Sequence, residues 1–115
     1  MDAATLEALG LAYLQARQLP MAQLTLGRAS ELQDTRPSTH SALGLALLLQ
    51  GDAMGARSAY GKALEADPTF DKAHANLAAL RCRFGDRDGA KHELALVKDA
   101  SLSGPDLDPE WKACR

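Results

Sequence analysis

Residues 37–70 read PSTHSALGLALLLQGDAMGARSAYGKALEADPTF, and this stretch decides how the whole chain is interpreted. Gly51 and Asp52 interrupt a sequence that is otherwise apolar and rich in alanine. A glycine followed by an aspartate is typical of a point where one helix ends and the next begins. The stretch therefore predicts two helices, 38–50 and 53–66, whose very short connection makes them antiparallel neighbours.

The same arrangement recurs on both sides of this stretch. Like residues return with a constant spacing, because 43 − 9 and 77 − 43 both equal 34. A fixed period of this length is the signature of a repeat protein, in which each unit stacks on the next. The sequence predicts one domain with three copies, and the positions that align are Leu9, Leu43 and Leu77, then Ala22, Ala56 and Ala90.

Composition predicts an all-helical protein. Alanine and leucine dominate the 115 residues, aromatic residues make up 4%, and no segment alternates apolar and polar residues over the length of a strand. Prolines and Gly-Asp pairs fall at even intervals between the apolar segments. Six helices are expected, over residues 3–16, 20–33, 38–50, 53–66, 71–84 and 87–100.

Charge and motif content exclude several classes of function. The net charge of −2 provides no uniform field that would attract nucleic acid or an anionic membrane, and no stretch is long and apolar enough for a membrane span. His40 and His74 take equivalent places in neighbouring repeats, about 10 Å apart, which is too far for one metal ion to join them. We expect both to be packing residues and His92 to be solvated, with no metal, no cofactor and no catalytic constellation.

The middle copy resembles the tetratricopeptide repeat. The residues that carry the resemblance are Leu43-Gly44, Leu47, Gly51-Asp52, Ala56, Tyr60, Ala63 and Pro68. The first copy departs from the family pattern at Arg17, which replaces the turn glycine, and the third departs at Arg81 and Leu102. The resemblance implies an α-α superhelix of three helix-turn-helix repeats, over residues 3–36, 37–70 and 71–104, with a concave side. Small bacterial proteins of pilus assembly and secretion look similar, by analogy alone.

In this family, residues of the first helix of each repeat line a concave groove that binds peptides. We expect Leu45, Leu48 and Leu49 to be uncovered along this inner curve, and the far end of the groove to be basic. An uncovered apolar groove suits an amphipathic helix or an extended peptide. Carried over residue by residue, the expected groove consists of Glu7, Leu11, Leu14, Gln15, Ser41, Leu45, Leu48, Leu49, Lys72, Ala75, Ala79, Cys82 and Arg83.

Two functions follow from this groove. The first is a non-enzymatic adaptor or assembly scaffold that binds a peptide from a partner protein. The second is a self-associating unit, or a fragment of a longer solenoid, whose leucine face is covered by a second copy or within the chain itself. Docking of heat-shock chaperone tails is rejected, because Glu7, Leu11 and Ala42 stand where the family's two-carboxylate clamp needs polar or basic groups.

The segment 105–115 is expected to form a short helix that caps the last repeat. Asp108 suits the N-cap of this helix and Pro109 its first turn, while Leu107 and Trp111 provide an apolar side that covers the last repeat. The alternative is that this segment also reaches the basic end of the groove and competes with a ligand there. A disulfide between Cys82 and Cys114 would join this segment to the last repeat. An oxidised pair would indicate an oxidising compartment such as the bacterial periplasm or cell envelope, and two free thiols would fit the cytosol.

Overall fold

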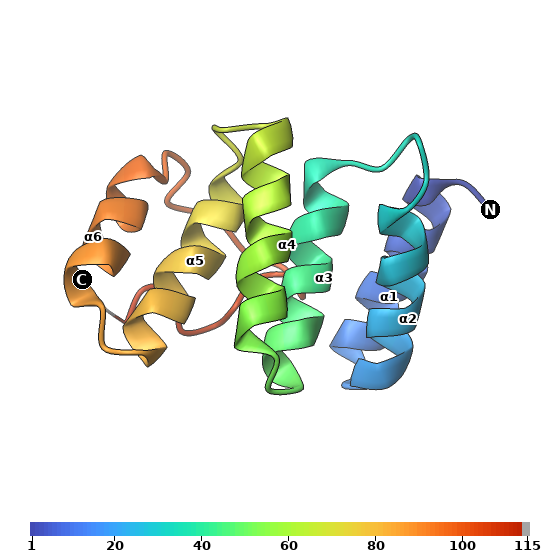
Figure 1. Ribbon diagram of the computed structural model, residues 1–115, viewed down its shortest axis with the longest axis horizontal. Helices are drawn as coiled ribbons and strands as arrows, with labels where there is room; N and C mark the ends of the chain where they lie inside the picture. Colours follow the sequence, from blue (N-terminus) through green and yellow to red (C-terminus); the bar gives the residue numbers. More distant parts are fainter. Residues whose placement is uncertain (114–115) are drawn as a thin grey trace.

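The computed structural model describes residues 1–113 and contains three antiparallel helix pairs (Figure 1). Their bounds agree with the expected bounds to within a few residues at most ends, and each pair lies within one of the three predicted repeats. The helices are α1 (Ala3–Gln15), α2 (Leu19–Ser30), α3 (Pro37–Leu49), α4 (Ala53–Ala66), α5 (Asp71–Arg83) and α6 (Arg87–Leu96).

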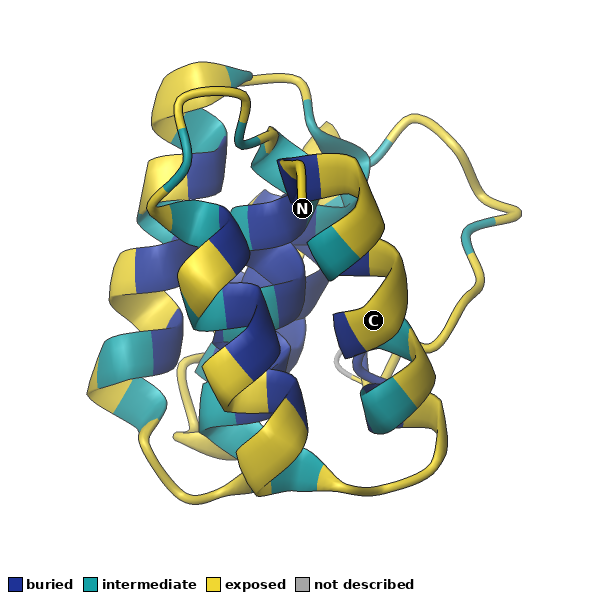
Figure 2. Ribbon diagram, turned by 90° about the vertical axis from the view of Figure 1, so that its right-hand side faces the viewer, coloured by how far each residue is buried: buried dark blue, intermediate teal, exposed yellow. Residues whose placement is uncertain are grey.

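The helices form two layers, and helices are closer to their neighbours in one layer than in the other. The first helices α1, α3 and α5 make one layer, in which α3 contacts both of its neighbours. The second helices α2, α4 and α6 make the other layer and, within the described part of the chain, do not contact one another. Figure 2 shows buried residues lining the space between the layers. Because the first helices lie closer together, the stack is an α-α superhelix whose concave side is formed by α1, α3 and α5.

Glycine on the first helix of each of the first two pairs lets its partner helix approach closely. A Cβ atom on Gly10 would lie 2.5 Å from Leu26 Cγ, and one on Gly44 would lie 2.5 Å from Tyr60 Cε1. Leu26 and Tyr60 are fully buried, so neither side chain has free space to move into. These contacts explain why small residues recur at this position of the repeat.

Aspartates begin the second helices of the middle and last repeats. Asp52 accepts a hydrogen bond from the backbone N–H of Gly55 at 2.8 Å, and Asp86 accepts one from Gly89 at 2.8 Å. Both contacts satisfy a backbone donor that the first helical turn leaves free. The hydrogen bond from Gly89 lowers the pKa of the Asp86 carboxyl, which strengthens the cap at neutral pH.

The turn between the paired helices requires a left-handed backbone. Gly51 adopts φ +92° and Gly85 adopts φ +82°. Arg17, the residue that replaces glycine in the first repeat, adopts φ +61° and is the only non-glycine residue with a positive φ in the described chain. The first repeat therefore keeps the turn of the others at the cost of placing a side chain in a conformation that favours glycine.

Two expectations for the C-terminal part are wrong. The sixth helix ends at Leu96 instead of residue 100, because the chain becomes extended at Val97 and the side chain of Asp71 accepts the backbone N–H groups of Lys98 and Asp99. The predicted capping helix is replaced by turns within residues 104–113. In those turns, Asp108 and Glu110 accept single backbone hydrogen bonds from Trp111 and Ala113.

We predict opposite effects for alanine at two glycines in helices. Gly44→Ala is expected to destabilise the protein by about 1–3 kcal/mol, because the new methyl group overlaps the Tyr60 ring. Gly61→Ala, in α4, meets no atom within 4 Å and is expected to stabilise it by about 0.5–1 kcal/mol. Chemical denaturation followed by circular dichroism measures both, and equal effects of the two variants would contradict the packing argument.

We predict that Arg17→Gly stabilises the chain by about 0.5–1 kcal/mol, because glycine relieves the left-handed strain while adding some freedom to the unfolded state. The reciprocal variant Gly51→Arg introduces the same strain in the middle repeat and is expected to lower the melting temperature. Thermal unfolding of the two variants beside the wild type tests the pair. A stability loss for Arg17→Gly would show that the Arg17 side chain contributes more than its backbone costs.

Candidate functional site

The concave side is the candidate site, and its α5 part is covered by the end of the chain. We call residues 97–113 the tail. In Figure 1 the tail, drawn in red, leaves α6 and passes behind α5 and α4, on the side where α3 lies. Residues 98–101 and 103–105 of the tail are exposed, whereas 106–108 are buried. The tail therefore reaches α5 through an exposed connection and then lies against it.

Asn76 binds the backbone of the tail. Its side-chain nitrogen donates a hydrogen bond to the carbonyl oxygen of Asp106 at 3.1 Å, and its side-chain oxygen accepts one from the N–H of Asp108 at 2.8 Å. The same nitrogen lies 3.1 Å from Ser41 Oγ on α3. Asn76 is fully buried, so all three contacts are shielded from water. A carboxamide that pairs with both backbone groups holds a segment independently of its side chains.

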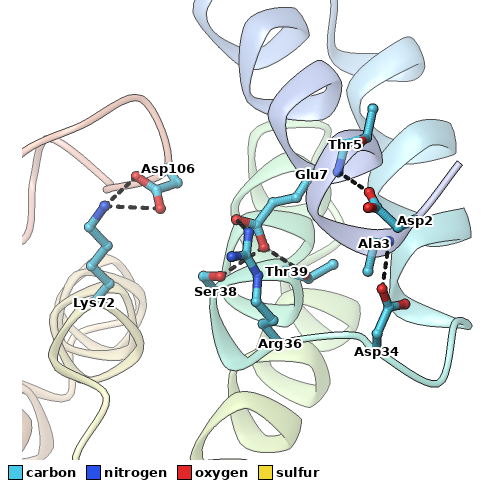
Figure 3. Close-up of polar contacts among 10 residues, drawn as sticks. All are labelled: Asp2, Ala3, Thr5, Glu7, Asp34, Arg36, Ser38, Thr39, Lys72 and Asp106. Carbon is cyan, nitrogen blue, oxygen red and sulfur yellow. Dashed lines mark hydrogen bonds and ion pairs between the residues drawn. The ribbon is translucent and has the colours of Figure 1, made fainter.

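Two cations of α5 bind the two aspartates on either side of Leu107. Lys72 Nζ lies 2.8 and 3.1 Å from the two carboxylate oxygens of Asp106 (Figure 3). Arg83 donates to both oxygens of Asp108, with its shortest contact at 2.8 Å. The hydrogen bond with Asp108 raises the pKa of the Arg83 guanidinium above its usual value. The expected basic end of the groove is therefore occupied by carboxylates of the same chain.

Apolar anchors complete the contact between the tail and α5. Leu107 and Trp111 are each more than nine-tenths buried, and both pack in one cluster with Ala75 and Ala79. The two alanines are fully buried. Because alanine is short, the surface of α5 leaves room for an indole ring to lie against it. The ammonium group of Lys112 also lies over the Trp111 ring, with Nζ 4.8 Å from the ring centroid.

The expectation that Leu45 is uncovered along the inner curve is wrong. Leu45 is only 2% exposed, so the chain itself covers it. Leu48 is half-buried and packs against a cluster that contains Tyr60 and Leu77. Leu49 is half-buried and packs against the cluster of the first two helix pairs. The extra leucines of α3 thus serve contacts between neighbouring repeats as well as the inner surface.

The α1 part of the concave side is polar and internally paired. Glu7 is buried and accepts hydrogen bonds from Arg36 at 2.7 Å, from Ser38 at 2.7 Å and from Thr39 at 2.5 Å (Figure 3). It therefore joins α1 to the start of α3 and is not a free group of the groove. The other expected groove residues from these helices differ in exposure: Leu14 and Ser41 are buried, Leu11 is half-buried and Gln15 is exposed.

One of the two cysteines lies within the described residues. Cys82 is half-buried on α5 and packs beside Ala78, Ala90 and Leu94, at the contact between α5 and α6. Cys114, the other residue of the predicted disulfide, lies outside the described residues. The disulfide therefore stays a prediction.

The histidines lie apart from the concave site. His74 is buried, with Nδ1 2.7 Å from a Glu93 carboxylate oxygen and Nε2 2.8 Å from the carbonyl oxygen of Pro68. It joins α5 to α6 and to the turn before α5, which is a packing role. His40 is half-buried, and burial lowers its pKa. His92 is exposed.

Sequence reasoning missed the partners of the basic residues. Lys72, Ala75, Ala79 and Arg83 were expected in the groove, and the structure brings them together around the tail. Asp106 was not singled out, and Asp108 was assigned to a helix cap. Charge was the signal that could have revealed these partners. Two aspartates on either side of Leu107 come later in the chain than the cations of the expected groove, and opposite charges attract.

Comparisons with known proteins agree with the helix-pair architecture. A family model described as tetratricopeptide repeat matches residues 47–113, which include the tail. A search of curated proteins found no match to the chain. Within the described residues, none of the helices combines the length and the apolar character needed to cross a membrane.

We predict that Asn76→Ala releases the tail from α5, because Asp106 and Asp108 would otherwise be buried with unpaired backbone groups, at a cost of about 1–3 kcal/mol. Trp111 is the single tryptophan, so its fluorescence reports this contact directly. The variant is expected to shift Trp111 emission to longer wavelength and to increase quenching by acrylamide. Gln15→Ala, an exposed change on α1, is the control. Unchanged emission in a helical Asn76→Ala variant would contradict the role of Asn76.

Proposed function

Because the chain belongs to the tetratricopeptide repeat family, whose members are protein–protein interaction modules, we propose that it is a non-enzymatic adaptor or assembly scaffold that binds an extended peptide on its concave side. One observation supports this function above all others. Asn76 makes two hydrogen bonds to the backbone of a segment that is not helical, at the carbonyl of Asp106 and the N–H of Asp108. This contact supports a role of the concave side of α5 in holding a peptide chain.

The form of the contact favours an extended peptide over a helical one. Within a helix, most backbone groups are paired with each other, so few remain for a side chain of the receptor. Asn76 instead pairs with backbone groups two residues apart on one edge of the segment. Recognition through the backbone gives affinity, and pockets for the side chains give selectivity.

The alternative of a leucine face shared with a second copy receives less support. Leu45 is covered within the chain, and Leu48 and Leu49 pack against neighbouring repeats. This alternative allowed the leucine face to be covered either by a second copy or by the chain itself. The burial of Leu45 agrees with cover by the chain itself. Peptide binding on α5 does not require any of these three leucines to be exposed.

Direct binding tests the proposed function in the full chain. We call the double substitution Asp106→Asn and Asp108→Asn the tail-weakened variant. It keeps the size of both side chains but removes the two carboxylate charges that bind Lys72 and Arg83. A dye-labelled peptide of residues 104–113, GPDLDPEWKA, is expected to bind this variant with one-to-one saturation in fluorescence anisotropy. A reductant in the buffer breaks any disulfide of Cys82 or Cys114, so that binding is measured with the tail held by non-covalent contacts alone.

Adding Asn76→Ala to the tail-weakened variant is expected to weaken binding at least about tenfold, because two buried hydrogen bonds are lost. Gln33→Ala in the same background, an exposed change in the turn after α2 and outside the groove, is the control and is expected to change the affinity little. If the tail-weakened variant is helical but binds no peptide with saturation, the concave side of α5 is not a peptide site.

A further inference from the structure

The tail shows which chemistry the α5 surface selects. Its segment 106–111 places one carboxylate on either side of an apolar residue, with an aromatic ring three residues after the second carboxylate. Each of these four side chains is buried against α5 or bound by one of its cations. We propose that the partner is an extended acidic segment with this same pattern, and that it binds by displacing the tail. The proposal rests on the proposed function of the concave side.

The two carboxylates are the groups that carry selectivity. The side chain of Asp108 is fully buried and that of Asp106 is 6% exposed, so each needs a cation to offset the loss of water. Arg83 meets Asp108 through two nitrogens, a geometry that matches the planar carboxylate. A segment with neutral side chains at these places would leave Lys72 and Arg83 without their partners.

The spacing of the cations matches a segment that runs along α5 in the same direction as the helix. Lys72, Asn76 and Arg83 recur at four and seven residues, which places them on one face of α5. Lys72 binds the first carboxylate, Asn76 the backbone between the two, and Arg83 the second carboxylate. The ligand carboxylates therefore belong to side chains within a segment, two residues apart.

The aromatic position provides the largest apolar contact. Trp111 is 7% exposed and packs on Ala75 and Ala79 together with Leu107. Large aromatic side chains in fully desolvated places dominate the energetics of many interfaces. A partner with an aromatic or large aliphatic residue at this position would bury the same alanine surface.

The connection between α6 and the docked segment allows exchange. Residues 98–101 and 103–105 are exposed, and the tail is tied to α5 at its start by Asp71, which accepts the N–H groups of Lys98 and Asp99. Once any disulfide of the predicted Cys82–Cys114 pair is reduced, this exposed connection allows the docked part to leave while the helix pairs stay packed. A ligand tethered by a short connection competes at an effective concentration in the millimolar range, so the tail sets a threshold that a partner must exceed.

Displacement is measured in the wild-type chain, in the same reducing buffer, with a peptide that contains no tryptophan. The peptide GPDLDPEFKA carries phenylalanine at the aromatic position, so Trp111 of the chain is the sole reporter. Adding it is expected to shift Trp111 emission to longer wavelength as the tail leaves α5. The labelled peptide GPDLDPEWKA is expected to bind the wild type at least about tenfold more weakly than the tail-weakened variant. Equal affinities would overturn displacement.

Selectivity is measured in the tail-weakened variant with altered peptides. Replacing both aspartates of the peptide by asparagine is expected to weaken binding at least about tenfold, as is inserting one glycine between leucine and the second aspartate. A receptor with Lys72→Glu is expected to prefer a peptide with lysine in place of the first aspartate. Circular dichroism of each variant checks that its helices are intact.

The outcomes separate this inference from the proposed function. If the asparagine and glycine-inserted peptides bind as tightly as the acidic one, the carboxylates are not read and this inference fails, although the concave side still binds peptides. If no peptide binds to a helical tail-weakened variant, both fail. If Lys72→Glu does not reverse the preference for the first charge, the assignment of Lys72 to that carboxylate is wrong.

Discussion

The close approach of paired helices is the constraint on which the rest of the structure depends. Gly44 lets the fully buried Tyr60 lie against α3, and Gly10 does the same for Leu26 against α1. Once each pair is held at this distance, its outer faces have a fixed shape, and the pairs stack through α2 with α3 and α4 with α5. The position of α5, and with it the line of Lys72, Asn76 and Arg83, follows from that stacking.

The candidate site combines a rigid surface with a segment that has little structure of its own. The surface belongs to α5, a helix with eight consecutive buried residues from Ala73 to Leu80. The segment belongs to the tail, which forms turns and depends on Asn76 for two of its backbone hydrogen bonds. The polar contacts of the tail cover the concave side of the last repeat. In the proposed function, a partner segment would reproduce the same contacts.

The fold was predictable from the sequence because its determinants are local and repeated. Gly51 with Asp52 marks the turn in one copy, and Gly85 with Asp86 marks it in another. The burial of Leu45 was not predictable in this way, since it depends on packing between elements and not on the local pattern of α3. The capping helix failed for a related reason. Asp108 has the residue type of an N-cap, and its carboxylate does accept the backbone N–H of Glu110 at 3.0 Å. It is also bound by Arg83, 25 residues earlier, and residues 109–113 form turns in place of a helix.

The unequal contact within the two layers has a mechanical consequence. In the described chain α3 contacts α1 and α5, while α2, α4 and α6 do not contact one another, so the outer layer has gaps between its helices. Widening or narrowing the gaps between these helices breaks no direct contact within the outer layer. The superhelix is therefore expected to change its curvature most easily. A group inserted between α1, α3 and α5 would spread these helices apart, with the α2–α3 and α4–α5 contacts acting as hinges.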